Sequence, residues 1–301
     1  MTSWNRVNDG TTKGPALHIE QSWWAMGNLG ENGREWSFEE KFHRIAEAGF
    51  SGISAVMPPE AEWESWKRQL EQYQFSFSTI AFPRKVQDLT DTIRQTKQFG
   101  AVQYINSQVM DAFVIDQEAT ELLQGLLQEA ESASIPLFIE THRGTVTQDL
   151  IRTADYVNKL PELKLVIDLS HYVVAGEMNG TSEAAEAHFD QLLRRTAGLH
   201  GRISNGEQVQ VDAGPEGEHP MVEHFTRWWR KGMSAWLKQA QPGDLLPFIP
   251  ELGPPYYYAI TEAAPGGDRE ISDRWQQALL LKRIAEEQWK QVLAQQQQAI
   301  L

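Results

Sequence analysis

The sequence alternates eight short apolar runs with longer amphipathic segments, and this rhythm constrains the fold more than any other feature. Strands that alternate with helices pair in parallel, and eight such repeats within 301 residues favour closure into a single-domain (β/α)8 TIM barrel. An open, doubly wound α/β sheet is the alternative. We expect the strands to cover Ala16–Ser22, Gly52–Met57, Phe75–Phe82, Val102–Ser107, Leu137–His142, Lys164–Leu169, Gly198–Ile203 and Leu246–Glu251.

The first segment between strands shows the clearest signals of a helix. Ser37 and Glu40 have the spacing of a capping box, Phe42 and Ile45 recur on one face, and Gly49 can end the helix. The other segments have similar helical spacing. We expect their helices at Ala61–Tyr73, Val86–Phe99, Gln117–Ser132, Thr147–Lys159, Ser182–Thr196, Met221–Ala240 and Ser272–Gln297.

No boundary in composition interrupts the rhythm, so we expect one domain over residues 16–301 after a flexible N-terminal segment of residues 1–15. Two long loops, Gly201–Pro220 and Leu252–Glu270, each follow a strand. Loops after strands lie at the catalytic face of a barrel, and we expect these two to cover a substrate.

Composition excludes several classes of partner and site. Lysine and arginine total 27 against 41 acidic residues, and the formal net charge of −14 disfavours nucleic acid or an anionic membrane as the main partner. The chain has no cysteine, which excludes disulfides, thiolate zinc sites and cysteine nucleophiles. The start does not resemble a signal peptide and no run of apolar residues is long enough to span a membrane, so a cytoplasmic protein is the simplest prediction.

Four polar residues stand at the ends of strands that otherwise read as buried. Three apolar residues precede Glu140 and also Asp168, and two apolar residues and a proline precede Glu251. His200 lies within the seventh strand. Buried carboxylates that converge on one mouth repel one another unless a cation lies between them. The sequence therefore predicts that Glu140, Asp168, His200 and Glu251 bind one divalent metal ion. One imidazole and three carboxylates suit Mn²⁺, Mg²⁺ or Co²⁺, with Zn²⁺ as a competitor.

Three further residues should face the same mouth. His142 is two residues past Glu140 and Arg202 is two past His200, so period-two geometry places each beside a predicted ligand. His171 is three past Asp168 and can bind substrate or orient that carboxylate. Arg202 can offset surplus negative charge or hold a substrate oxygen. The alternatives are ordinary loop histidines and a salt bridge without a role in the reaction.

Aromatic residues add less specific signals. Trp23, just after the first strand, can stack on the face of a sugar or pack under the neighbouring helix. Trp228 and Trp229 fall in a helical segment as core or subunit contacts, and on this basis a homo-oligomer is plausible. His18 and Glu20 share one face of the first strand, which lines either the barrel floor or the substrate pocket.

Four segments together resemble the metal-site strands of the xylose-isomerase-like superfamily: Phe138–His142, Ile167–His171, Leu199–Arg202 and Ile249–Glu251. Sugar isomerases and epimerases of that superfamily present Glu, Asp, His and Glu in this order from strands five to eight. In its ketose 3-epimerase branch the two metal-bound glutamates exchange the proton of the substrate carbon, which implies this role for Glu140 and Glu251. The same branch implies that His171 and Arg202 bind substrate oxygens.

The departures from the superfamily patterns restrict the prediction to one metal. Xylose isomerases proper carry a lysine where this chain has His142, and an Asp-x-Asp that this sequence lacks. Its apurinic-site endonucleases need further histidines and an Asp-x-His that are missing here. Pro250, directly before Glu251, cannot donate to a sheet ladder, so we expect a bulge at that position.

The sequence thus predicts an isomerase or epimerase of carbohydrate metabolism. Its substrate would be a small polyhydroxylated carbonyl compound, a sugar or polyol derivative, and its chemistry a metal-assisted proton transfer between carboxylates and carbon. A dehydratase on the same scaffold is the nearest alternative. A metal-dependent hydrolase or endonuclease, and a barrel that binds a sugar without catalysis, are alternatives of other classes.

Overall fold

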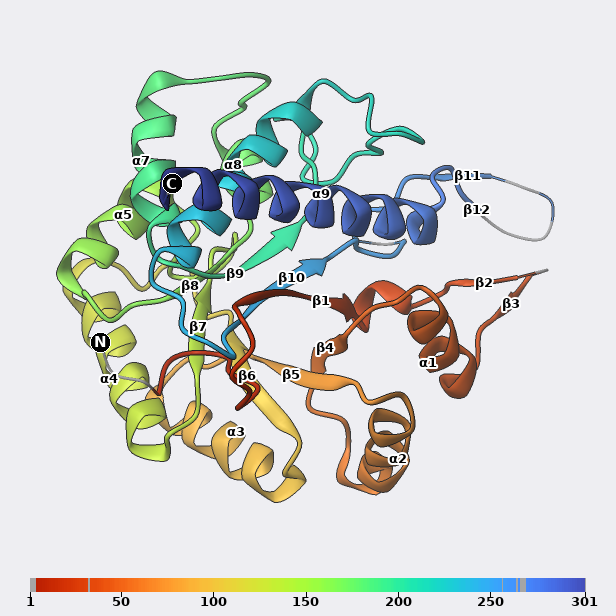
Figure 1. Cartoon of the computed structure of the whole chain (residues 1–301), viewed down its shortest axis with the longest axis horizontal. Helices are drawn as coiled ribbons and strands as arrows, with labels where there is room; N and C mark the ends of the chain where they lie inside the picture. Colours follow the sequence, from red (N-terminus) through yellow and green to blue (C-terminus); the bar gives the residue numbers. More distant parts are fainter. Residues whose placement is uncertain (1–3, 32, 256, 264, 266–268, 301) are drawn as a thin grey trace.

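The chain forms a closed barrel of eight parallel strands in the order β1-β10-β9-β8-β7-β6-β5-β4, which confirms the predicted fold and excludes the open sheet (Figure 1). The computed structural model describes residues 4–31, 33–255, 257–263, 265 and 269–300. The barrel strands are β1 (Ala16–Ser22), β4 (Gly52–Val56), β5 (Ser76–Ala81), β6 (Val102–Ser107), β7 (Leu137–Glu140), β8 (Leu165–Ile167), β9 (Thr196–Gly201) and β10 (Leu245–Pro250).

Helices surround the strands and connect them. Two short hairpins, β2 (Gly30–Glu31) with β3 (Arg34–Glu35) and β11 (Thr261–Glu262) with β12 (Arg269–Glu270), lie at the end toward which β1, β9 and β10 point (Figure 1). That end is the mouth of the barrel. The helices are α1 (Phe38–Glu47), α2 (Trp63–Tyr73), α3 (Val86–Phe99), α4 (Asp116–Ala133), α5 (Leu150–Lys159), α6 (Ser170–Ala175), α7 (Glu183–Leu193), α8 (Met221–Leu237) and α9 (Arg274–Ile300), with 3₁₀ turns η1 (Trp24–Met26) and η2 (Glu60–Glu62).

The predicted capping box of α1 is present. The Ser37 hydroxyl accepts a hydrogen bond from the Glu40 amide at 3.2 Å, and the Ser37 amide donates to the Glu40 carboxylate at 2.7 Å. The α5 helix begins later than expected because Asp149, rather than a residue near Thr147, caps it through the Arg152 amide at 2.8 Å. Local side-chain hydrogen bonds thus decide where these helices start.

Other boundaries also differ from expectation. β9 begins at Thr196, a residue expected to end the preceding helix, and β7 ends at Glu140, before His142. The short helix α6 was not predicted, and it places His171 on a helix rather than in a loop.

The tryptophans of α8 belong to the core. Trp228 and Trp229 are 1% and 0% exposed, and Trp229 packs edge-on against Phe248 of β10 with ring centroids 5.3 Å apart. Their burial confirms the core alternative for these two residues, because neither ring has exposed surface for a contact with another subunit. The homo-oligomer stays a prediction.

The segment before β1 contacts the base of the barrel. Val7 is buried, its carbonyl accepts from the Leu245 amide at 2.9 Å, and Asn8 forms a bridge with Asp244. Residues 1–3 lie outside the described residues, and the flexibility expected for residues 1–15 stays a prediction. Across the part of the chain that the structure describes, none of the helices combines the length and the apolar character needed to cross a membrane.

Glu186 of α7 connects this helix to α8 through hydrogen bonds. Its carboxylate accepts from Arg227 at 2.6 and 2.8 Å, from the Trp228 indole at 2.7 Å and from Lys231 at 3.2 Å. Burial alone would raise the pKa of Glu186, but these three donors lower it to about 2. The folded pKa therefore lies below the unfolded value of about 4.5.

We expect Glu186→Gln to lower the free energy of unfolding by about 2 kcal/mol at pH 7, because an ionised acceptor of four hydrogen bonds is lost. A depressed folded pKa stabilises the fold above the unfolded pKa, and this contribution disappears as the pH falls from about 4.5 through about 2. Urea unfolding at several pH values measures the difference, with Glu183→Gln on the same helix as control. An equal loss at pH 7 and at the acid end would contradict this account.

Candidate functional site

The four residues predicted as metal ligands converge at the mouth. Glu140 ends β7, Asp168 and Glu251 directly follow β8 and β10, and His200 lies in β9. All four are buried, with exposures of 0 to 4%. His200 Nδ1 lies 3.3 Å from Glu251 Oε2, 3.6 Å from Glu140 Oε1 and 4.0 Å from Asp168 Oδ2.

Glu140, Asp168, His200 and Glu251 form a ring of side chains at the mouth, and Arg202 supplies a positive charge to this ring. Its Nη2 donates to Asp168 Oδ2 at 2.7 Å and to Glu251 Oε2 at 2.5 Å, and its Nε donates to the same Asp168 oxygen at 3.1 Å. The guanidinium is 1% exposed, and its Nη1 has no hydrogen-bond partner among the described residues. Arg202 therefore offsets carboxylate charge, as one of its two predicted roles required, and keeps one donor free.

The acids of the ring differ in proton affinity. Burial raises the pKa of Glu140, and the charges of Glu251 and Asp168 raise it further against the opposing effect of His200. Burial would also raise the pKa of Glu251, but His200 and Arg202 lower it to about 2. In the same way Arg202 outweighs burial and lowers the pKa of Asp168. Glu140 is thus the ring carboxylate that takes up a proton most readily.

The ring histidine is also affected by its neighbours. Burial would lower the pKa of His200, but Glu251 and Glu140 raise it to about 9. Without a further cation, the imidazole is therefore protonated at neutral pH. A metal ion that binds His200 must displace that proton.

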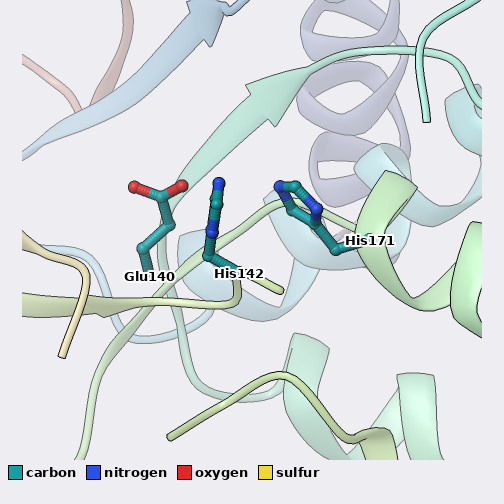
Figure 2. A group of neighbouring side chains, drawn as sticks. All are labelled: Glu140, His142 and His171. Atoms are coloured by element: carbon teal, nitrogen blue, oxygen red, sulfur yellow. The ribbon is translucent and has the colours of Figure 1, made fainter. Parts of the chain in front are cut away.

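Two further histidines lie beside Glu140, as the period-two argument predicted for His142. The rings of His142 and His171 have centroids 4.0 Å apart, and ligand atoms of both lie within 4.8 Å of each other and of a Glu140 oxygen. Figure 2 shows the three side chains side by side. His171 is fully buried, and neither of its ring nitrogens has a hydrogen-bond partner within the described ranges. Both rings can therefore bind a ligand at this position.

Helix α6 positions His171. Asp168 Oδ1 accepts from the Ser170 amide at 2.9 Å and from the Ser170 hydroxyl at 2.6 Å, and this turn starts the helix directly after β8. His171 Nε2 then lies 3.6 Å from Asp168 Oδ2. The turn explains why a residue three positions past the aspartate faces the mouth.

Two amides that the sequence analysis did not single out hold Glu140. Asn106 Nδ2 donates to Glu140 Oε2 at 2.6 Å, and Gln108 Nε2 lies 3.1 Å from both oxygens. Asn106 and Gln108 share one face at the end of β6 by the period of two, which was the available signal. Neutral donors orient the carboxylate without supplying a positive charge.

Glu20 and His18 line the interior of the barrel. Glu20 is fully buried, accepts from Ser78 at 2.5 Å and from the Tyr104 hydroxyl at 3.1 Å, and burial raises its pKa to about 7. His18 Nε2 lies 2.6 Å from the Ser76 hydroxyl. Glu20 thus adds a carboxyl group below the ring that is protonated part of the time at neutral pH.

Pro250 does not interrupt the hydrogen-bonded pairing of β10 with β9. β10 pairs with β9 through Pro250↔Gly201, and the Glu251 amide donates to the Gly201 carbonyl at 3.2 Å. Pairing with β1 ends earlier, at Ile19↔Phe248, so the missing N–H of Pro250 falls where that ladder has already stopped. No register shift marks this part of the described sheet, which corrects the expected bulge.

The two long loops meet over the mouth. The Gln210 side chain bonds the Gly253 amide at 2.7 Å and the Gly253 carbonyl at 3.2 Å. The ring of Tyr258 lies between two guanidinium groups, 4.9 Å from Arg143 and 5.2 Å from Arg202. The loops therefore cover the ring, and the position of Tyr258 directly over Arg202 was not evident from sequence.

Trp23 lies with the core aromatics. Its ring centroid is 4.8 Å from Trp66, 5.2 Å from Phe42 and 5.6 Å from Phe38. These contacts with α1 and α2 agree with the packing alternative. Trp23 is only partly buried, and its stacking on a sugar stays a prediction.

The ring suits a divalent metal ion. Ligand atoms of Glu140, His200 and Glu251 lie within 4.8 Å of one another, and His200 Nδ1 is a buried nitrogen without a hydrogen-bond partner in the part of the chain described. Three ionised carboxylates and one guanidinium leave two negative charges, which one divalent cation would neutralise. Both oxygens of Asp168 accept hydrogen bonds, Oδ1 from Ser170 and Oδ2 from Arg202, whereas Arg202 occupies only Oε2 of Glu251. Glu140, His200 and Glu251 are therefore the readier ligands.

We expect Arg202→Met to lower the free energy of unfolding in EDTA by about 3–5 kcal/mol, since two buried carboxylates lose their cation. Mn²⁺ should then stabilise the variant more than the wild type, because the site has gained negative charge. Thermal unfolding with and without Mn²⁺ measures both effects, and Arg227→Met, outside the mouth, serves as control. No shift with Mn²⁺ in either protein would rule out a cation site here, and equal shifts in both would show that Mn²⁺ does not sense the charge of Arg202.

Comparison with known proteins gives a family. Residues 42–204, more than half of the chain, match the model of the xylose isomerase-like TIM barrel family. No curated protein sequence matches the chain significantly.

Solved structures share the fold at low identity. A xylose isomerase-like TIM barrel protein from Mycobacterium smegmatis in complex with magnesium is 13% identical, with a TM-score of 0.59 over 92% of this chain and 98% of that one. The probable 3-DHS dehydratase AsbF from Bacillus anthracis is 14% identical, with a TM-score of 0.55 over 88% and 97%. An AP endonuclease, family 2, from Brucella melitensis is 15% identical, with a TM-score of 0.52 over 79% and 94%.

Proposed function

The chain belongs to the xylose isomerase-like TIM barrel family, and we propose that it is a metal-dependent sugar isomerase or epimerase. The observation that carries the proposal is the convergence of Glu140, His200 and Glu251 within ligand distance of one another beside the guanidinium of Arg202. The magnesium complex of a structural neighbour supports a divalent ion, of which Mn²⁺, Mg²⁺ and Co²⁺ suit the ligands best and Zn²⁺ is a competitor.

When bound, the metal ion would polarise the carbonyl and hydroxyl oxygens of a small polyhydroxylated substrate and acidify the C–H bond next to the carbonyl. Glu140, His200 and Glu251 would hold it, with Asp168 as a fourth ligand once Arg202 releases that carboxylate.

Glu140 and Glu251 are the proposed proton-transfer groups. Glu140 is the better base, because its pKa is raised, whereas His200 and Arg202 hold the pKa of Glu251 down to about 2. The amides of Asn106 and Gln108 fix the Glu140 carboxylate during the transfer. Glu140 would therefore remove the proton from carbon and keep it until it exchanges with water. In an epimerase, Glu251 would take up a different proton from water and deliver that proton to the opposite face of the carbon.

The donors around the ring suit substrate oxygens. Arg202 Nη1 is buried and has no partner in the described ranges, so it can donate to a carbonyl or hydroxyl oxygen. His142 and His171 flank Glu140 and can bind neighbouring hydroxyl groups. A substrate rich in hydroxyl groups would satisfy these donors together.

His142 also supports a dehydratase as second candidate. If His142 protonates a hydroxyl group β to the carbonyl, the enolate formed by Glu140 loses water instead of being reprotonated. One neighbour in fold is a probable dehydratase. Both functions share the first step and differ in the fate of the enolate.

We expect the Mn²⁺-loaded protein to exchange deuterium from the solvent onto the carbon next to the carbonyl of its ketose substrates. Glu140→Gln should lower this exchange by about 10³-fold, because it removes the base but keeps the shape. Mass spectrometry of a ketose panel in deuterated water measures the exchange. Glu183→Gln, on the surface of α7, is the matched control.

The product decides between the two candidates. Retained mass apart from deuterium indicates isomerisation or epimerisation, and loss of water indicates a dehydratase. Exchange that persists in Glu140→Gln, or no exchange across the panel, would contradict the proposed proton transfer.

A further inference from the structure

A basic cavity lies at the base of the barrel, at the opposite end from the mouth. Its volume is about 430 Å³, and Arg6, Lys164, Arg194 and Arg195 line it with Glu162 as the acidic residue. Lys164 directly precedes β8, while Arg194 and Arg195 follow α7. These elements lie at the left of Figure 1, away from the two hairpins.

Three of the four cationic side chains that line this cavity lack an acidic partner among the described residues. Arg195 donates to the carbonyls of Pro161 at 2.6 Å and Val157 at 3.1 Å, which fix the guanidinium without neutralising it. Lys164 and Arg194 form no ion pair with any described residue. The whole chain carries a net charge of −14, so a cavity lined by unpaired cations differs in charge from the rest of the protein and can attract an anion.

Electrostatic repulsion inside the cavity agrees with this arrangement. Burial lowers the pKa of the Lys164 ammonium group, and the charges of Arg195 and Arg6 lower it further. Arg6 is already paired with Asp244 at 2.8 Å. A bound anion would relieve the repulsion between Lys164 and Arg195.

Part of the basic surface next to the cavity is neutralised. On α8, Arg227 and Lys231 pair with Glu186, and Lys231 also pairs with Asp190. This pairing reduces the positive charge that the neighbouring surface offers to a nucleic acid, whereas Lys164, Arg194 and Arg195 keep their charge unpaired within the described residues.

The cavity is separate from the ring at the mouth. Tyr104, Phe138, Val166 and Val7 form a buried apolar layer across the base of the barrel. A ligand in the cavity therefore has no direct contact with Glu140 or Arg202.

We propose that this basal cavity binds the phosphate or pyrophosphate group of a small metabolite, with Lys164 and Arg194 as adjustable donors and Arg195 as a fixed one. Arginine and lysine donors form charge-assisted hydrogen bonds to phosphate oxygens, and several cations match the multiple charges of that group. The cavity is larger than one phosphate, so it also holds part of the molecule that carries it.

Titration calorimetry with pyrophosphate on the full chain in EDTA tests the site. We expect about one equivalent to bind, about tenfold more weakly in Lys164→Glu and Arg194→Glu, since each replaces a donor by a like charge. Lys97→Glu, which makes the same charge change on α3, should bind as the wild type does. Circular dichroism checks that each variant is folded, and Lys164→Gln replaces Lys164→Glu if the latter is not.

Saturable binding that Lys164 and Arg194 variants weaken, and that Lys97→Glu leaves unchanged, supports the site. No binding by the wild type, or binding that depends on Arg202 and not on Lys164, overturns it. The proposal is also overturned if pyrophosphate does not bind but a single-stranded oligonucleotide does and its binding requires Lys164. The surface would then recognise a macromolecule.

Discussion

The contact of Arg202 with Asp168 and Glu251 is the interaction on which the mouth of this barrel depends. It compensates two buried carboxylates with one buried guanidinium, and leaves Glu140 and His200 to share the remaining charge. His200 and this contact together lower the pKa of Glu251, whereas burial keeps that of Glu140 raised although His200 lies near it too. The asymmetry between two chemically identical groups therefore follows from which of them faces the arginine.

The barrel was predictable because its signal is repeated along the chain. Each strand is short and apolar, and the carboxyl ends of parallel strands must meet at one mouth. The positions of Glu140, Asp168, His200 and Glu251 followed from this rule and from the order of the strands, without knowledge of any contact. Period-two alternation placed His142 and Arg202 beside them in the same way.

Features that depend on packing between distant segments were not predictable. No sequence pattern shows whether Arg202 pairs with two acidic side chains or stays free to bind a substrate. The sequence also does not identify Asn106 and Gln108 as hydrogen-bond donors to Glu140. In the sequence, the tryptophans of α8 are compatible with a surface that contacts another subunit. In the structure, side chains of β10 and α9 pack against them. The basal cavity joins Arg6 to residues more than 150 positions later, which only the closed barrel brings together.

The central claim is that one divalent ion binds between Glu140, His200 and Glu251 beside Arg202. A crystal structure with Mn²⁺, recorded near the manganese absorption edge, locates the ion by anomalous scattering. The account predicts one strong peak about 2.0–2.3 Å from ligand atoms of these three residues. A peak held by His142 and His171 without His200, or no peak when Mn²⁺ saturates the solution, would contradict it.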